Sequence, residues 1–338
     1  MPIGAFIAGC AGPTLTEDER SLFARSRPWG LILFRRNCIV PDQIKTLTSD
    51  FRDAVGRKSA PVFVDQEGGR VQRMGPPSNA WRRYPPARAY GELYQCDPIA
   101  ALRTARHVGR LMAADLTDVG ITANCVPVLD VPQPNADNII GDRAYDADPG
   151  RIMALARAHV AGFLDGGVLP VMKHIPGHGR AAVDSHKALP VVDASMADLS
   201  ATDFPPFAAF ADLPMAMTAH VVYTALDKDN PATLSRTVIS SVIRNLIGFD
   251  GLLMTDDLSM HALAGTFASR ARRALDAGCD LVLHCNGNMA EMEEIAEAAG
   301  TLSGASLRRA RAALRFARKP LPFDPQMALK DLDALVSG

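Results

Sequence analysis

The sequence alternates short apolar runs with amphipathic segments along almost its whole length. The runs are mostly continuous rather than alternating, which is typical of parallel strands buried on both faces. Eight runs fit this description, at residues 5–8, 30–34, 61–65, 121–130, 168–172, 215–219, 251–254 and 280–284. Eight strand–helix units in one chain predict an α/β fold, a (β/α)₈ barrel. A doubly wound open sheet stays the alternative, because the number of repeats does not distinguish the two.

Amphipathic segments with helix-ending signals lie between the apolar runs. The segment 41–55 begins with Pro41 at a first-turn position and is followed by Gly56. The same reasoning predicts helices at residues 98–119, 151–164, 235–247, 269–277 and 306–318. Two excursions rich in proline or polar residues, 74–93 and 132–148, interrupt the rhythm, but no low-complexity linker does. We therefore expect a single domain over residues 1–338.

Composition excludes several classes of protein. The chain has 338 residues, which is normal for a barrel with insertions. Hydrophobic residues make up 48% and charged residues 22%, a composition that predicts a large buried core and argues against disorder. The net charge is −1 and no basic stripe is interleaved with aromatic residues, which argues against a nucleic-acid partner. We expect a monomer that acts on a small molecule.

The cysteines and apolar runs predict a cytoplasmic protein. The six cysteines are scattered without a C-x-x-C pair, which is typical of reduced thiols in the cytosol. No apolar run approaches the ~20 residues of a membrane helix, so we expect no membrane association. Residues 7–10 resemble a lipoprotein cleavage site, but no Lys or Arg precedes them and the apolar stretch is short. We interpret them as part of the first strand.

Chemically active side chains lie at the ends of the apolar runs or just after them. They are Asp65, Asp130, Lys173, His174, His220, Asp256 and His284. In a (β/α)₈ barrel the C-terminal ends of all strands meet on one face, and that face carries the active site. The coincidence of so many polar residues with strand ends predicts a catalytic pocket there.

The segment 173–186 is the most informative of these regions. It holds Lys173, His174, His178, Asp184 and His186. Asp184 and His186 are two residues apart, so in an extended segment both side chains face the same way. The carboxylate would then fix the imidazole tautomer and raise its basicity, as in a Ser-His-Asp triad without the serine. The alternative is a metal-dependent hydrolase with His174, His178 and His186 as zinc ligands.

Two further segments carry carboxylates at strand ends. Asp65 is followed by paired glycines and two arginines, the second of them Arg73, and such groups form charge-assisted hydrogen bonds with sugar hydroxyls. Asp256 should point into the pocket, whereas Asp257 should cap the next helix. A proton relay on one loop and a carboxylate on another is what cleavage of a glycosidic bond requires. Arg143, in the second excursion, predicts by itself only a loop.

Together, four segments resemble the glycoside hydrolase family 3 β-N-acetylglucosaminidases of the bacterial peptidoglycan-recycling type. They occur in the family's order, as Asp-Gln-Glu-Gly-Gly-Arg-Val-Gln-Arg at 65–73, Ile-Gly-Asp-Arg at 140–143, Lys-His-Ile-Pro-Gly-His-Gly at 173–179 with Asp-Ser-His at 184–186, and Thr-Asp-Asp-Leu at 255–258. The chain departs at Ile175, where Phe is usual, and beside Arg143, where Glu, Ser and Phe are usual. These departures keep the charged groups, so they concern substrate detail rather than the reaction.

The resemblance implies a single barrel, without cofactor or metal, that releases GlcNAc from peptidoglycan fragments (GlcNAc-anhydroMurNAc-peptides). It implies a retaining reaction through a covalent glycosyl-enzyme. Asp256 would be the nucleophile, His186 the proton donor and acceptor, and Asp184 the partner of His186. The residues implied to grip the GlcNAc ring are Asp65, Arg73, Arg143, Lys173 and His174.

Two alternatives stay close to this interpretation. A neutral imidazole repels anions less than a carboxylate does, so phosphate would be able to replace water as the acceptor and make the protein a GlcNAc phosphorylase. A sugar-binding barrel without catalysis is the non-enzyme alternative, since a fold does not fix a function. The presence of both Asp256 and His186 argues against it.

Overall fold

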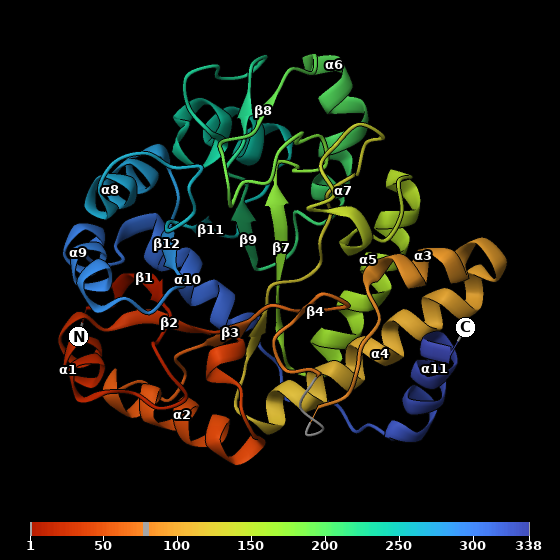
Figure 1. Ribbon diagram of the computed structural model, residues 1–338, viewed down its shortest axis with the longest axis horizontal. Helices are drawn as coiled ribbons and strands as arrows, with labels where there is room; N and C mark the ends of the chain where they lie inside the picture. The colour runs from red at the N-terminus through yellow and green to blue at the C-terminus, as the bar shows by residue number, and fades with distance from the viewer. Residues whose placement is uncertain (1, 77–80, 338) are drawn as a thin grey trace.

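The computed structural model describes residues 2–76 and 81–337 and shows a closed barrel of eight parallel strands (Figure 1). In chain order the strands are β1 (Gly4–Ala8), β2 (Pro28–Leu33), β3 (Val62–Val64), β6 (Ala123–Asn124), β7 (Leu169–Ile175), β9 (Met215–Thr218), β11 (Leu252–Asp257) and β12 (Leu281–His284). Each strand overlaps one predicted apolar run. The first and last strands pair in parallel from Phe6 opposite Val282 to Ala8 opposite His284. This pairing confirms the barrel and contradicts the open sheet.

Helices surround the strands and cover their outer face (Figure 1). Most predicted helices are confirmed to within a few residues, as α2 (Pro41–Ala54), α4 (Pro98–Asp118), α5 (Pro149–Asp165), α8 (Phe267–Ala277) and α10 (Gly304–Phe316), while the segment 235–247 is π-helical as η5 (Val238–Leu246). Other helices were not predicted, and they are α1 (Glu17–Ser26), α3 (Ala87–Cys96), α6 (Met196–Asp198), η3 (Leu199–Asp203), α7 (Phe204–Ala209), α9 (Met289–Ala299), α11 (Pro325–Ser337) and the short turns η1 (Arg35–Asn37), η2 (Gly141–Arg143) and η4 (Ala232–Leu234).

Short antiparallel and parallel ribbons form part of the loops that leave the barrel strands. The excursion 74–93 runs into α3, and its residues 77–80 lie outside the described residues. Just before it, β4 (Gln66–Gly68) and β5 (Val71–Gln72) form an antiparallel hairpin. A second ribbon pairs β8 (Val191–Val192) with β10 (Val222–Tyr223). These loop elements bring side chains from distant parts of the chain over the barrel.

The burial pattern of the strands points to one face of the barrel. Every residue of the eight barrel strands is buried except Asp256 and Asp257, which are half-buried at the end of β11. Burying an unpaired carboxylate is costly, so a strand that is buried on both faces can end in two carboxylates only where it reaches a cavity or solvent. The C-terminal end of β11 is therefore where the barrel opens.

A buried amide joins the end of β6 to the chain that follows β3. The strand β6 is shorter than the predicted run 121–130, because the Val126 N–H bonds to the Asn124 carbonyl at 2.8 Å and pairing with β7 resumes only as a bridge between Val128 and Lys173. The side chain of Asn124 takes over two ladder bonds: its Oδ1 accepts from the Gln66 N–H and its Nδ2 donates to the Gln66 carbonyl, both at 2.9 Å. This pair fixes the chain immediately after Asp65.

Among the described residues, no helix is long and apolar enough to cross a membrane. All six cysteines are unpaired, and five of them are buried.

Candidate active site

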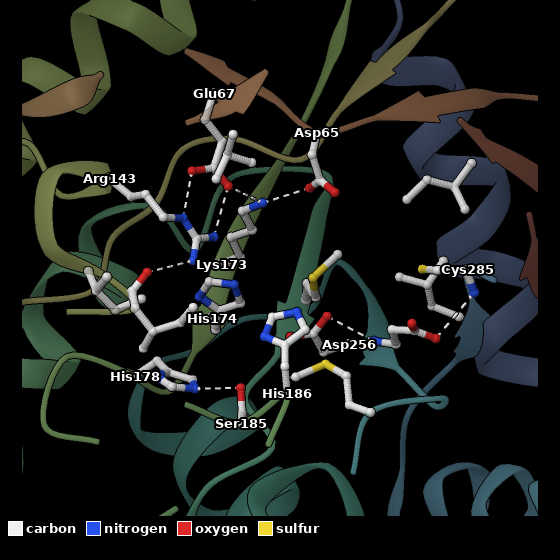
Figure 2. Close-up of a pocket in the computed structure, with 18 of the residues that line it drawn as sticks. Asp65, Glu67, Arg143, Lys173, His174, His178, Ser185, His186, Asp256 and Cys285 are labelled. Carbon is white, nitrogen blue, oxygen red and sulfur yellow. Dashed lines mark hydrogen bonds and ion pairs between the residues drawn. The ribbon is translucent and has the colours of Figure 1, made fainter. Parts of the chain in front are cut away.

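A pocket of about 230 Å³ opens at the C-terminal ends of the strands. It brings together nearly all the sequence-predicted site residues, namely Asp65, Arg73, Arg143, Lys173, His174, His186 and Asp256. These residues come from β7, β11 and the loops after β3 and β6, as well as from the loop after β7 (Figure 2). Asp184 lies next to the pocket, behind His186, and does not line it.

Lys173 is the centre of a buried network of charges on one wall. Its Nζ lies 2.8 Å from Oδ1 of Asp65 and 2.6 Å from Oε1 of Glu67. Burial acts to lower the pKa of Lys173, but the two carboxylates outweigh it and the pKa is raised. Burial likewise acts to raise the pKa of Asp65, yet Lys173 and Arg73 hold it well below its usual range. The network therefore stays fully charged at neutral pH.

Two arginines complete the network. Arg73 donates from Nη2 to Oδ2 of Asp65 at 3.0 Å. Arg143 holds Glu67 in a bidentate pair, with Nε and Nη2 each 2.8 Å from a carboxylate oxygen (Figure 2). Burial opposes ionisation of Glu67, but Arg143 and Lys173 bring its pKa down to about 2. Paired, planar contacts of this kind fix the orientation of the arginine as well as its charge.

Glu67 was missed as a site residue by the sequence interpretation, although the quoted motif contained it. Its spacing from Asp65 was the signal in the sequence that could have identified it. Asp65 and Glu67 are two residues apart at the start of the β4–β5 hairpin, so in extended backbone both side chains face the same side. Both of them reach Lys173 from that side.

Asp130 organises the second wall of the pocket. It is fully buried, and its Oδ2 lies 2.7 Å from Nδ1 of His174. Its Oδ1 accepts the backbone N–H groups of His174 at 3.2 Å and His178 at 2.7 Å. Burial acts to raise the pKa of Asp130, but these partners lower it further than burial raises it. The sequence placed Asp130 at a strand end without giving it a role.

Asp256 stands at the end of β11 and faces the pocket. Its Oδ1 accepts the backbone N–H of Asp257 at 2.8 Å, and the carboxylate makes no ion pair with any described residue. Burial acts to raise the pKa of Asp256, whereas His174, His220 and the backbone N–H lower it, and the net shift is downward. Asp256 is thus an ionised carboxylate without a cationic side chain bound to it.

The predicted role of Asp257 as a helix cap is wrong. Its Oδ1 accepts the backbone N–H groups of Ser259 at 3.0 Å and Cys285 at 3.2 Å, so it ties the end of β11 to the end of β12. The helix α8 begins ten residues later, at Phe267, and its cap is Thr266, whose Oγ1 accepts from the N–H of Ser269 at 3.2 Å. A longer loop than expected separates the strand from the helix.

The Asp184–His186 pair forms, but in a turn rather than in extended backbone. Both Nδ1 and the backbone N–H of His186 lie 2.9 Å from Oδ1 of Asp184. Partial burial acts to raise the pKa of Asp184, and the contacts with His186 lower it below its usual value. The His186 side chain is 63% exposed, and its ring lies beside Asp256 in the pocket (Figure 2).

Two other histidines are held by protein groups near the pocket. His220 is buried, with Nδ1 2.7 Å from Oγ1 of Thr233 and Nε2 3.0 Å from the Asp257 carbonyl. It therefore supports the end of β11. The Nε2 of His178 lies 3.1 Å from Oγ of Ser185, the residue before His186.

The zinc alternative meets a geometric obstacle. His174, His178 and His186 each direct one ring nitrogen to a different protein oxygen, on Asp130, Ser185 and Asp184 respectively, so only the second nitrogen of each ring is left for a metal. Among residues 2–76 and 81–337, no three His, Cys, Asp or Glu side chains lie close enough to hold one metal ion. The residues present do not fit a metal centre.

Comparisons with known proteins agree with this geometry. Residues 10–317 match the family described as "Glycosyl hydrolase family 3 N terminal domain". The "Beta-hexosaminidase" of Alkalilimnicola ehrlichii is 41% identical over 290 residues, which cover 85% of this chain and 82% of that protein.

Solved structures show the same fold over the whole chain. The crystal structure of NagZ from Neisseria gonorrhoeae in complex with N-trifluoroacetyl-D-glucosamine is 32% identical, with a TM-score of 0.89 and coverage of 99% of this chain and 98% of that one. NagZ of the same organism in complex with zinc ion is 31% identical, with a TM-score of 0.86 and coverage of 99% and 98%. The chain belongs to glycosyl hydrolase family 3 and is an enzyme of the β-N-acetylhexosaminidase type.

Proposed function

We propose that this enzyme removes terminal β-linked GlcNAc from peptidoglycan fragments, with retention of configuration and through a covalent glycosyl-enzyme. The observation that carries the proposal is the position of Asp256 and His186 in one pocket whose opposite wall is the charged network around Lys173. One ionised carboxylate and one imidazole then serve the two chemical roles that two carboxyl groups serve in most retaining glycosidases.

In the first step an oxygen of Asp256 attacks C1 of the terminal sugar. The bond from C1 to the bridging oxygen breaks, and His186 in its protonated form gives its proton to that oxygen. The products are a glycosyl ester on Asp256, a neutral leaving alcohol and a neutral imidazole. Asp256 suits the role because it is ionised and, among the described residues, has no cation to compete for its electron pair.

In the second step the neutral imidazole of His186 takes a proton from water. The water oxygen attacks C1 from the side that the aglycone left, so the configuration is retained and Asp256 returns as a carboxylate. Asp184 holds Nδ1 of His186 at 2.9 Å in both steps. This contact fixes the tautomer and stabilises the positive charge that the ring carries between turnovers.

The charged wall grips the sugar. Asp65 and Glu67 carry oxygens that accept from sugar hydroxyls, while Arg73, Arg143 and Lys173 carry N–H groups that donate to them. His174 joins the grip from the wall that Asp130 holds. A volume of about 230 Å³ supports the binding of one terminal sugar unit, since pockets that bind drug-sized ligands have volumes of roughly 300–1,000 Å³.

The substrate proposal rests on the relatives and on the cysteines. A hexosamine derivative is the ligand named for the related NagZ of Neisseria gonorrhoeae. Six unpaired cysteines are in keeping with a cytoplasmic enzyme, the compartment in which imported cell-wall fragments would be degraded. Every group used in the two steps comes from one chain, which supports a functional monomer.

Parallel assays with aryl β-GlcNAc and aryl β-glucoside test the reaction and the need for the 2-acetamido group. We expect release of the aryl alcohol from the first substrate and little from the second. Release of GlcNAc from GlcNAc-anhydroMurNAc-peptide, followed by chromatography, tests the natural substrate. An enzyme that cleaves both aryl glycosides equally, or neither, would contradict the proposal.

The same assay tests two alternative hypotheses, a phosphorylase and a metal-dependent hydrolase. If phosphate is the second acceptor, the reaction in phosphate buffer yields GlcNAc-1-phosphate, whereas free GlcNAc alone supports hydrolysis. The related NagZ of Neisseria gonorrhoeae has been crystallised in complex with zinc ion, so the metal-dependent alternative is tested as well, although the described histidines here do not form a metal site. Activity that survives a chelator supports the glycosidase mechanism, and activity that disappears and returns with added zinc supports the alternative.

A further inference from the structure

The proton-transferring histidine stands on a loop that has one buried attachment. We call residues 182–189 the His186 loop. In it, Ser185 alone is buried, at 3% exposed, while its other residues are exposed or half-buried. The hydrogen bond between Asp184 and His186 lies within the loop, so it shapes the turn but does not hold the turn over the pocket.

Ser185 is attached to the barrel through His178. The Nε2 atom of His178 lies 3.1 Å from Oγ of Ser185, and both side chains are about 3% exposed and line the pocket (Figure 2). His178 itself is rigidly placed, because its backbone N–H donates to the fully buried Asp130 at 2.7 Å. The contact therefore joins the loop to a fixed point of the barrel.

The chain around His178 has no room to shift. A Cβ atom added to Gly179 would lie 2.0 Å from the carbonyl oxygen of Val131. The carbonyl of Gly179 also accepts from the Gln133 N–H at 3.0 Å. The root of the loop is thus packed against the segment after Asp130, and its last backbone contact with that segment is the Ala181 carbonyl, which accepts from the Asp137 N–H at 2.8 Å.

The chemistry of the contact suits a hinge that opens and closes. Burial lowers the pKa of His178 to about 4, so its ring is neutral at working pH and its hydrogen bond with Ser185 carries no ionic attraction. Its Nδ1 atom is buried and has no hydrogen-bond partner among the described residues. A single neutral hydrogen bond contributes about 1 kcal/mol, which favours the closed loop without locking it.

We propose that His178 and Ser185 form a latch that positions His186 over the bridging oxygen of the substrate. They are positioning residues, because they act through His186 and touch no reacting atom. The inference rests on the proposed glycosidase function and adds to it the element that closes the loop. When the latch opens, Asp256 and the sugar-gripping wall stay in place and the proton donor is lost.

The latch predicts a dependence on the leaving group that a general loss of structure would not give. An aryl alcohol of low pKa leaves without a proton, whereas one of high pKa needs the proton of His186. Weakening the latch should therefore lower kcat/KM for poor leaving groups and leave it unchanged for dinitrophenyl β-GlcNAc. One lost hydrogen bond corresponds to a decrease of about five- to tenfold.

Two matched pairs of variants test this prediction. Ser185→Ala removes the hydroxyl, and Ser185→Thr keeps it. His178→Gln keeps an N–H donor at the position of Nε2, whereas His178→Asn moves the donor to the position of Nδ1. Val183→Ala is the loop control, since Val183 is 40% exposed and makes no side-chain hydrogen bond. Because each pair changes a different side of the same hydrogen bond, one pair still tests the latch if a variant of the other pair fails to fold.

The measurement is kcat/KM for a series of aryl β-GlcNAc substrates, with thermal unfolding of each variant. We expect Ser185→Ala and His178→Asn to lose activity progressively as the leaving-group pKa rises, and Ser185→Thr, His178→Gln and Val183→Ala to follow the wild type. A loss that is equal for all substrates, or no loss in Ser185→Ala, overturns the latch. Retained activity of Asp256→Ala would instead overturn the proposed function, so the two failures are distinguishable.

Discussion

At the scale of single residues, the carboxylates around the pocket differ in the kind of group that binds them. Asp65 and Glu67 are bound to cationic side chains, and Asp130 is bound to His174. Asp256 is held by a backbone N–H and makes no ion pair with any described residue. A nucleophile needs a lone pair that is not engaged by a cation. Asp257 also lines the pocket without an ion pair, but Ser259 and the Cys285 N–H bind its carboxylate, which leaves Asp256.

The first prediction concerns the two residues proposed to do the chemistry. Asp256→Ala should abolish turnover almost completely, because no neighbouring carboxylate is free to replace it. His186→Ala should lower kcat about 10²–10⁴-fold, the usual contribution of acid–base catalysis. Steady-state assays with an aryl β-GlcNAc measure both effects.

Mass spectrometry gives an independent check of the first prediction. A GlcNAc derivative that slows hydrolysis of the ester should leave an adduct on the peptide that contains Asp256, and none in Asp256→Ala. An adduct on another carboxylate would refute the assignment even if Asp256→Ala were inactive.

At the scale of elements, the β4–β5 hairpin fixes the charged wall. It carries Glu67 and lies between Asp65 and Arg73 in the sequence. Its turn contains Gly68 with φ +103° and Gly69 with φ +57°, conformations that L-residues with a Cβ rarely adopt. The paired glycines of the motif are therefore required by the turn rather than by a ligand.

The second prediction follows from the crowding at this turn. A Cβ atom on Gly68 would lie 2.1 Å from the carbonyl oxygen of Pro85, so Gly68→Ala must displace the hairpin. We expect a loss of about 1–3 kcal/mol in the free energy of unfolding, together with a raised KM. Urea unfolding and steady-state kinetics measure these two quantities.

Gly12→Ala is the matched control for Gly68→Ala. A Cβ at Gly12 meets nothing within 4 Å, and no positive φ is found there. It should leave both stability and KM close to the wild type. If Gly68→Ala behaves in the same way, the hairpin is not the element that places the wall.

The elements differ in how far the sequence predicted them. The barrel strands are continuous apolar runs, so they can be recognised in the sequence without any knowledge of the tertiary structure. The helix α1 also had a readable signal, the capping box in which Oγ1 of Thr16 accepts from the Glu19 N–H at 3.1 Å and the Glu19 carboxylate accepts from the Thr16 N–H at 2.8 Å. Short loop elements such as η2 had no comparable signal in the sequence, because contacts with distant residues stabilise them.

At the scale of the whole molecule, the buried charges link stability to pH. A carboxyl group whose pKa is lowered by folding stabilises the protein above its unfolded pKa, and this stability is lost as the pH falls through the folded pKa. For Glu67 the window lies between the ordinary value of 4.5 and the folded value of about 2. Asp65, Asp130 and Asp256 act in the same direction.

The third prediction is that Glu67→Gln lowers the free energy of unfolding strongly at neutral pH and less strongly at acid pH. Removing one partner of a buried ion pair leaves Arg143 uncompensated, at a cost of about 3–5 kcal/mol in the free energy of unfolding. As the pH falls from 4.5 towards about 2, wild-type Glu67 becomes protonated and the difference between the two proteins should narrow.

Urea unfolding over a pH series measures this difference. Glu297→Gln, at an exposed position on α9, is the control and should match the wild type at every pH. A difference between wild type and Glu67→Gln that stays constant from neutral to acid pH would show that the cost does not come from the charge.

The sequence by itself determined the order of the eight barrel strands and of the helices with clear end signals, the face of the barrel that carries the chemistry, and most of its charged residues. Hydrophobic periodicity and strand ends are local properties, so they can be read along the chain. The partners of those residues were decided by tertiary structure alone. The contacts Glu67–Arg143, Asp130–His174 and Lys173–Asp65 join residues 44 to 108 positions apart. Only closure of the barrel brings such residues together, because each contact depends on where strands that are distant in sequence end in space.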